Sequence, residues 1–154
     1  YLWYGNPDID GRYLHWDHAV LPHWTDSVNA QHPSVGTRFS PPEEVHSPFY
    51  PARGTYSSSD PQVLREQMQE MLRAGIRVIV VSWWGPEWRS GTSDTQGVQT
   101  DKVLPIVMQA AEDNGMLVAF HLEPYPNRTA KTVKEDLKYL MNNYAKSPAL
   151  YRIN

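Results

Sequence analysis

Residues 75–85 read GIRVIVVSWWG, and this stretch decides the fold. Its segment 76–81 consists of β-branched side chains with one interruption, Arg77, and such side chains favour strands. A short apolar run without polar alternation is typical of a strand buried on both faces, as in parallel sheets. The run is far shorter than the ~20 apolar residues of a membrane-spanning helix, so we expect no membrane insertion.

Helical patterns lie on both sides of this strand. Before it, Asp60 suits an N-cap, Pro61 suits the first helical position, and Gly75 is typical of a helix end. The apolar residues between them share one helical face: Leu64, Met68, Met71 and Leu72. After the strand we predict, in order, a polar loop at 85–99, a helix beginning near Thr100 or Asp101, a strand at 116–120, a helix at 131–145 and a short strand at 150–153.

Strands and helices therefore alternate along most of the chain, with 2–4 as an additional first strand. Alternation of this kind is typical of an α/β fold whose parallel strands are joined by right-handed crossovers. We predict one domain over residues 1–154, with about three strand–helix units. So few parallel strands cannot close into a barrel, and the sheet would leave an unpaired edge strand and apolar faces exposed. We therefore expect a homodimer or higher homo-oligomer that covers them.

The segment 5–60 has neither helical nor strand periodicity. It holds 7 of the 13 prolines and 5 of the 6 histidines. A structureless stretch of this length is functional or disordered in most proteins. Its aromatic residues argue against disorder, since they can bury substantial area: Trp16, Trp24, Phe39, Phe49, Tyr50 and Tyr56. We predict an ordered but irregular wrap.

The overall composition excludes several classes of function. The chain has 154 residues and a net charge of −3, which supplies no basic surface for nucleic acid. It has no cysteine, which excludes disulfides, thiolate metal sites and a cysteine nucleophile. His15, Asp17, His18 and His23 could suggest a metal site, but they lie in the irregular segment, and we expect neither a metal nor a cofactor.

The predicted strand ends carry the residues with chemistry. The carboxyl ends of parallel strands form the ligand site of α/β proteins. Here the segments 3–6, 82–85 and 121–125 deliver aromatic rings, an amide, an imidazole and a carboxylate to one edge. Flat rings suit the C–H face of a sugar, and the polar groups suit its hydroxyls. We therefore predict a carbohydrate site.

The two tryptophans and the glutamate of this edge each have two competing interpretations. Strand alternation points only one of Trp83 and Trp84 into the site, and Trp83 is the better candidate for the core. For Glu123, the alternative to sugar binding is a structural hydrogen bond to a loop.

Motifs along the whole chain resemble one known family. They are Trp3-Tyr4-Gly5-Asn6, the segment 13–18 (YLHWDH), Phe49-Tyr50-Pro51, Tyr56-Ser57-Ser58, Ser82-Trp83-Trp84 and the segment 121–125 (HLEPY). In this order they resemble the endo-α-mannosidases of glycoside hydrolase family 99, and also marine invertebrate lectins built on that scaffold. The resemblance implies a (β/α)₈ barrel that acts on α-mannosides of N-glycans or mannans without an essential cofactor.

The resemblance also implies sugar-contacting positions. Tyr4, Trp84 and Glu123 correspond to positions of the family's −1 and −2 subsites, and the family has Trp or Tyr at the position of Trp84. The remaining residues that we expect to contact sugar are Asn6, His15, His18, His121 and Tyr125.

The chain departs from the family in its length. A full barrel needs about 250 residues, so this chain resembles a partial, half-like barrel. The family's catalytic pair, two glutamates three residues apart, would lie beyond it, and no such pair occurs here at a strand end. Glu87 and Asp94 are the only candidate partners for Glu123, and both lie in a loop. We therefore predict no catalytic residue in the chain.

Three functions remain open at this stage. The first is a non-catalytic lectin that binds mannose-containing or galactose-ended glycans such as N-acetyllactosamine. The alternative is a fragment or half of an endo-α-mannosidase, and the third is a structural partner that binds no sugar, which the retained aromatic residues disfavour. The sequon at Asn127-Arg128-Thr129 favours a secreted or extracellular protein.

Overall fold

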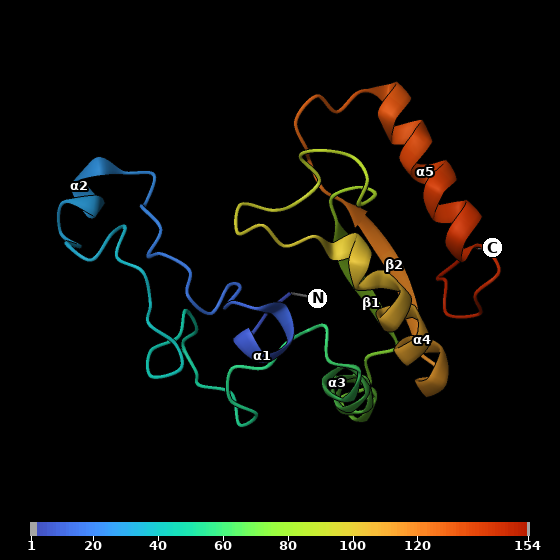
Figure 1. The fold of residues 1–154 in the computed structure, drawn as a ribbon, viewed down its shortest axis with the longest axis horizontal. Helices are drawn as coiled ribbons and strands as arrows, with labels where there is room; N and C mark the ends of the chain where they lie inside the picture. Colours follow the sequence, from blue (N-terminus) through green and yellow to red (C-terminus); the bar gives the residue numbers. More distant parts are fainter. Residues whose placement is uncertain (1–2, 154) are drawn as a thin grey trace. The chain divides into compact units, whose positions relative to one another are not determined.

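A computed structural model describes residues 3–153 (Figure 1). The chain divides into two compact units, Trp3–Ser57 and residues 58–153. A single domain over residues 1–154 stays a prediction.

Residues 58–153 form an α/β unit around a two-stranded parallel sheet. Its elements are α3 (Pro61–Arg73), β1 (Val78–Trp83), the 3₁₀ helix η1 (Thr100–Lys102), α4 (Leu104–Asn114), β2 (Leu117–Leu122) and α5 (Ala130–Tyr144). β1 and β2 pair in register from Val78↔Leu117 to Trp83↔Leu122. The predicted α/β class with parallel strands is confirmed.

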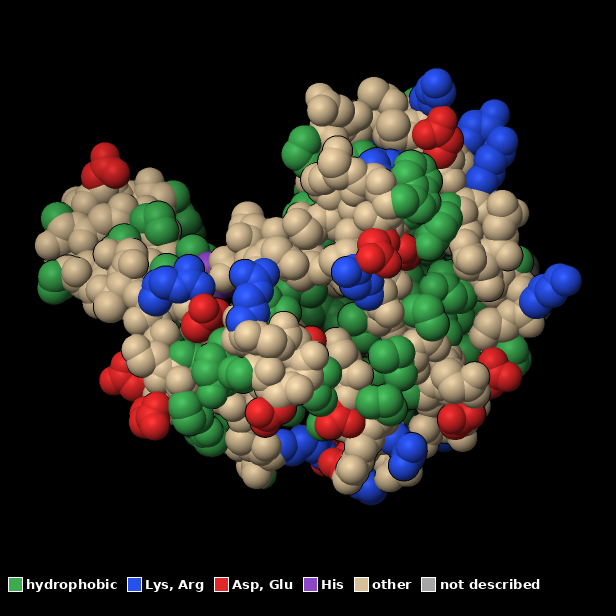
Figure 2. All heavy atoms as spheres, viewed as in Figure 1, with side chains coloured by type: hydrophobic (Ala, Val, Ile, Leu, Met, Phe, Trp, Pro, Cys, Tyr) green, Lys and Arg blue, Asp and Glu red, His purple; other side chains and the backbone are tan. Residues whose placement is uncertain are grey.

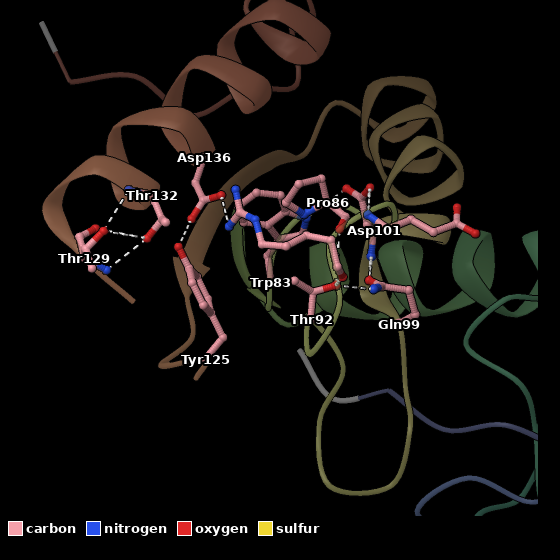
Figure 3. A network of polar contacts seen from close by, with 11 residues as sticks. Trp83, Pro86, Thr92, Gln99, Asp101, Tyr125, Thr129, Thr132 and Asp136 are labelled. Atoms are coloured by element: carbon pink, nitrogen blue, oxygen red, sulfur yellow. Dashed lines mark hydrogen bonds and ion pairs between the residues drawn. The ribbon is translucent and has the colours of Figure 1, made fainter. Parts of the chain in front are cut away.

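The helix ends follow the local signals in the sequence. The Asp60 carboxylate accepts the backbone N–H of Gln62 at 2.8 Å and caps α3, whose first residue is proline. Gly115 ends α4 in the left-handed region, at φ 67°. A capping box between Thr129 and Thr132 begins α5 (Figure 3).

The sheet is covered on one face only. Ile79, Val81 and Trp83 are buried, and α4 packs against both β2 and α3. Val80, on the opposite face of β1, is 52% exposed. The prediction that this strand is buried on both faces is therefore wrong for the described residues, because no element of this unit covers the second face.

Strand positions also differ from the prediction. β1 and β2 each end two residues later than predicted, at Trp83 and Leu122. Of the predicted first strand, Leu2 lies outside the described residues, and Trp3 and Tyr4 are not in a strand.

The two ends of the described chain pair differently. Near the N-terminal end, Gly5 forms an antiparallel bridge with Leu14 of the same unit, through two backbone hydrogen bonds of 3.1 and 3.0 Å. At the other end, Leu150 forms a single parallel bridge with Val118, so the predicted strand at 150–153 is reduced to one bridging residue. The described residues therefore contain two strand–helix units, each a strand with its following helix, rather than three.

Residues Trp3–Ser57 are irregular, as predicted, apart from α1 (Pro7–Asp10) and α2 (Asp26–Asn29). Trp16 is buried, and its indole N–H donates to the Tyr56 carbonyl at 2.9 Å. Trp24 is 90% exposed and Phe49 is also exposed. Of the aromatic rings that argue against disorder in this segment, Trp16 is therefore buried, whereas Trp24, Phe49 and Tyr50 are exposed.

The surface carries charges of both signs. On the face shown in Figure 2, lysine and arginine side chains are scattered between aspartates and glutamates. Within residues 3–153, every helix is too short or too polar to cross a bilayer.

Candidate functional site

Trp84 and Glu123 lie side by side at the carboxyl edge of the sheet. Each is the first residue after its strand. The backbone N–H of Glu123 donates to the Trp83 carbonyl at 2.9 Å, which extends the parallel ladder by one step. The backbone pairing therefore places these two residues next to each other at the carboxyl ends of β1 and β2.

Glu123 has an imidazole partner at this edge. The Nδ1 atom of His121 lies 3.1 Å from Oε1 of Glu123. The His121 side chain is 63% exposed and that of Glu123 only 17%. The pair offers an acceptor carboxylate in a largely dry position and an imidazole that reaches the solvent, a combination that suits sugar hydroxyls.

The two neighbouring tryptophans have different environments. Trp83 is 1% exposed and stacks on Tyr139, with ring centroids 5.8 Å apart. Trp84 is half-buried. The prediction that Trp83 is the core residue of the pair is confirmed, and Trp84 is left as the ring at the site.

A buried carboxylate, that of Asp101, holds the end of β1 at Trp83 in place (Figure 3). Asp101 accepts the Trp83 indole N–H at 2.9 Å, the Glu87 backbone N–H at 2.9 Å and the Tyr139 hydroxyl at 2.8 Å. Burial and the hydrogen bond to Asp101 raise the pKa of Tyr139, so its hydroxyl stays a donor. Sequence reasoning took Asp101 only as the start of a helix.

A second carboxylate engages Tyr125. The Tyr125 hydroxyl donates to Asp136, which is fully buried, and Arg89 forms an ion pair with Asp136 at 2.6 Å (Figure 3). Tyr125 is itself buried, and the Arg89 guanidinium lies 5.3 Å from its ring centroid. The hydroxyl and the ring of Tyr125 are therefore both engaged in this polar network rather than at the solvent-facing edge.

The other four expected site residues belong to Trp3–Ser57. The Tyr4 ring stacks on Trp16 at 3.9 Å and contacts the edges of His15 and Tyr56. Burial raises the pKa of Tyr4. The cluster holds the Tyr4 ring in one orientation.

Asn6 has a structural role in the same unit. Its Oδ1 atom caps α1 by accepting the Ile9 backbone N–H at 3.1 Å. Its Nδ2 atom donates to the Thr55 carbonyl at 3.1 Å. Both ends of the amide are therefore engaged by backbone groups.

Three histidines form a column. The His15 and His18 rings stack at 5.9 Å, and those of His18 and His46 at 4.9 Å. Burial, followed by the charges of His18 and His15, lowers the pKa of His46. In residues 3–153 no three histidine, aspartate or glutamate side chains are grouped so as to hold a metal ion.

Each unit thus assembles part of the expected site. Residues 58–153 bring together Trp84, His121 and Glu123, and Trp3–Ser57 brings together Tyr4, His15 and His18. Arg89, Asp101 and Asp136 were missed, because a buried charge that holds a loop has the same local sequence context as a solvated one.

Comparison with known proteins identifies relatives over the full chain. The family model for glycosyl hydrolase family 99 matches residues 1–154. The mouse (Mus musculus) glycoprotein endo-alpha-1,2-mannosidase-like protein is 42% identical over 152 residues, which is 99% of this chain and 32% of that protein. The rat (Rattus norvegicus) glycoprotein endo-alpha-1,2-mannosidase is 41% identical over the same shares of each chain, 99% and 32%.

The structural comparison agrees. The GH99 endo-alpha-mannosidase from Bacteroides thetaiotaomicron superimposes with a TM-score of 0.77 at 33% identity, over 99% of this chain and 40% of that one. The chain spans about a third of the length of the curated relatives it matches, and its open parallel sheet is consistent with part of their barrel. The match over residues 1–154 shows that the chain belongs to glycosyl hydrolase family 99.

Proposed function

We propose that this chain is the sugar-binding N-terminal part of an endo-α-mannosidase, and that it holds a mannose-containing glycan at the carboxyl edge of β1 and β2. The observation that carries the proposal is the placement of Trp84 beside Glu123 at that edge. The relatives are named mannosidases, and the chain matches about a third of their length. This fits part of a glycosidase better than a lectin.

The chemistry of the edge explains how a mannoside is held. The Trp84 ring receives the C–H face of a pyranose, and stacking of this kind contributes about 0.5–1.5 kcal/mol beyond burial. The Glu123 carboxylate accepts hydrogen bonds from sugar hydroxyl groups, each worth roughly 1.5–3 kcal/mol because the acceptor is charged. His121 limits the motion of that carboxylate through the 3.1 Å contact.

Hydrolysis needs a second carboxyl group. Glycosidases place two of them about 5–9.5 Å apart across the scissile bond. Glu87 pairs with Lys102 at 3.0 Å, and Asp94 accepts the backbone N–H groups of Gln96 and Val98. Glu87 is thus paired with a residue of η1, and Asp94 is engaged by backbone groups of its own loop, so we propose that the acid and the base come from residues outside 1–154.

The first prediction concerns the two central contacts. Trp84→Ala and Glu123→Gln are each expected to weaken binding of a mannose oligosaccharide about tenfold, because each removes roughly 1.4 kcal/mol. Isothermal titration calorimetry on the folded variants is the measurement. Ile76→Ala, at the opposite end of the sheet, is the control, since Ile76 is an exposed apolar residue away from the carboxyl edge. Full affinity in both site variants would move the binding site elsewhere.

The second prediction concerns catalysis. Residues 1–154 alone are expected to release no sugar from an endo-α-mannosidase substrate, since the edge supplies one carboxylate. Reducing-sugar assays on the isolated chain provide the test. Turnover that is lost in Glu123→Gln would show that the chain carries its own catalytic pair.

The sugar class can be decided with the same protein. We propose mannose because the relatives are named for it, whereas the tryptophan-rich edge also suits galactose-ended chains. A glycan array that carries both classes separates them. Retention of galactose-ended glycans alone, without hydrolysis, would favour the lectin function.

The third prediction concerns assembly. An apolar groove of about 500 Å³ lies open between β2, α5 and the C-terminal segment, with Phe120, Leu137 and Tyr151 in its lining. We propose that a homodimer covers such surface when the chain is on its own. Light scattering at micromolar concentration is expected to give twice 17.7 kDa, and a stable monomer contradicts the idea.

We also propose that the protein is secreted or extracellular. Asn127 of the sequon is exposed, in the turn before α5. Mass spectrometry of protein from its natural source would show a glycan on Asn127 if the proposal is correct.

A further inference from the structure

Trp88 is a large aromatic residue that no part of the proposed function uses. It lies in the loop that follows β1, four residues beyond Trp84, and it is 72% exposed. An exposed indole contributes well to ligand binding only if its position is fixed before the ligand arrives. Otherwise the side chain loses conformational entropy when the complex forms, which opposes association.

The backbone that carries Trp88 is held on both sides. The Arg89 N–H donates to the Pro86 carbonyl at 3.0 Å, which closes a turn with Trp88 inside it. The Glu87 N–H donates to Asp101 at 2.9 Å, and the buried Thr92 hydroxyl lies 2.6 Å from the Arg89 carbonyl. The turn is therefore anchored in the core of its unit.

The ring of Trp88 is also held. The Arg89 guanidinium lies over it, 5.4 Å from the ring centroid, and 5.3 Å from that of Tyr125. The same guanidinium pairs at 2.6 Å with Asp136, which is fully buried. One face of the indole therefore rests on a fixed cation, and its high exposure leaves the other face to the solvent.

We infer that Trp88 forms an outer sugar subsite, which stacks on a further pyranose of the oligosaccharide that occupies Trp84 and Glu123. The inference rests on the proposed function. Trp84 directly follows β1, and Trp88 lies within the turn that begins two residues later, so both belong to the loop at the carboxyl end of this strand. A flat aromatic ring whose position is fixed before binding, and which has one face open to solvent, suits the C–H face of a sugar ring. Such stacking requires no sugar hydroxyl in a particular position. The ligand class is therefore a mannose oligosaccharide longer than a disaccharide.

The test is a length series of thio-linked mannose oligosaccharides, which resist hydrolysis, titrated into the full-length protein by calorimetry. Wild type is expected to gain affinity from disaccharide to tetrasaccharide. Trp88→Ala should leave the disaccharide affinity unchanged and weaken the tetrasaccharide about tenfold. Trp88→Phe, which keeps a flat ring, should retain most of the gain, and Ile76→Ala should match wild type throughout.

The outcomes separate this inference from the proposal beneath it. Equal affinities of wild type and Trp88→Ala for every length would overturn the outer subsite and leave the site at Trp84 and Glu123 intact. A wild type that gains nothing with length would also overturn it. A wild type that binds no mannose oligosaccharide would overturn the proposed function and the subsite with it.

Discussion

Replacing Asp136 with leucine is expected to lower the free energy of unfolding by about 3–5 kcal/mol, the range for breaking one side of a buried ion pair. The Arg89 side chain is 16% exposed, and beyond its ion pair both terminal nitrogens are buried without a hydrogen-bond partner within residues 3–153. Asp136→Leu would leave that guanidinium without its counter-ion and remove the acceptor of the Tyr125 hydroxyl. Urea denaturation measures the loss.

Two controls show whether burial is the cause. The Glu87–Lys102 pair has side chains 56% and 59% exposed, so Glu87→Gln is expected to cost about 0–1 kcal/mol. The double variant Asp136→Leu with Arg89→Met removes both charges. It should recover much of the lost stability, because no buried charge is then left without a counter-ion. A loss below about 1 kcal/mol in Asp136→Leu would contradict the assignment of this pair as an anchor of the loop.

Trp83→Ala is the second substitution with a large expected effect, a loss of about 3–5 kcal/mol, as for other buried tryptophans. It would empty the space between the sheet and Tyr139 and leave Asp101 without its indole donor. Trp83→Phe fills most of that space but supplies no N–H group. We therefore expect it to cost about 1–3 kcal/mol, the desolvation penalty of an acceptor that has lost a partner.

Trp84→Ala is the matched control, since it removes the same side chain one position along. Trp84 is only half-buried, so its loss should show mainly in sugar affinity and only weakly in stability. Thermal unfolding of the two variants, followed by circular dichroism, makes the comparison. Equal losses of stability would mean that the two tryptophans share the core.

Local signals were enough to predict the three long helices and the order of the elements within residues 58–153. Asp60 with Pro61 begins α3, and Gly115 ends α4, because caps and left-handed glycines act within a few residues of the helix end. The strand ends were predicted well enough to place Trp84 and Glu123 at the same edge. Once the two parallel strands are neighbours in the sheet, their carboxyl ends lie together, and so do the residues that follow them.

Other features depend on contacts between distant residues. The sequence shows that 76–81 is apolar, but only the tertiary structure decides which face is covered, and Val80 is left exposed. Tyr125 resembles an edge residue in the sequence, whereas its hydroxyl is taken by Asp136, 11 positions away.

The sequence by itself therefore determined the α/β order, the helix ends, the family motifs and the residue types at the sheet edge, because each depends on short-range backbone preferences or on a local pattern. The tertiary structure alone decided that Asp101 and Asp136 are buried anchors and that Trp88 is held by Arg89. A charged side chain has the same local sequence context whether it is solvated or buried. Its environment, and hence its role, is created only when residues far apart in the chain pack together.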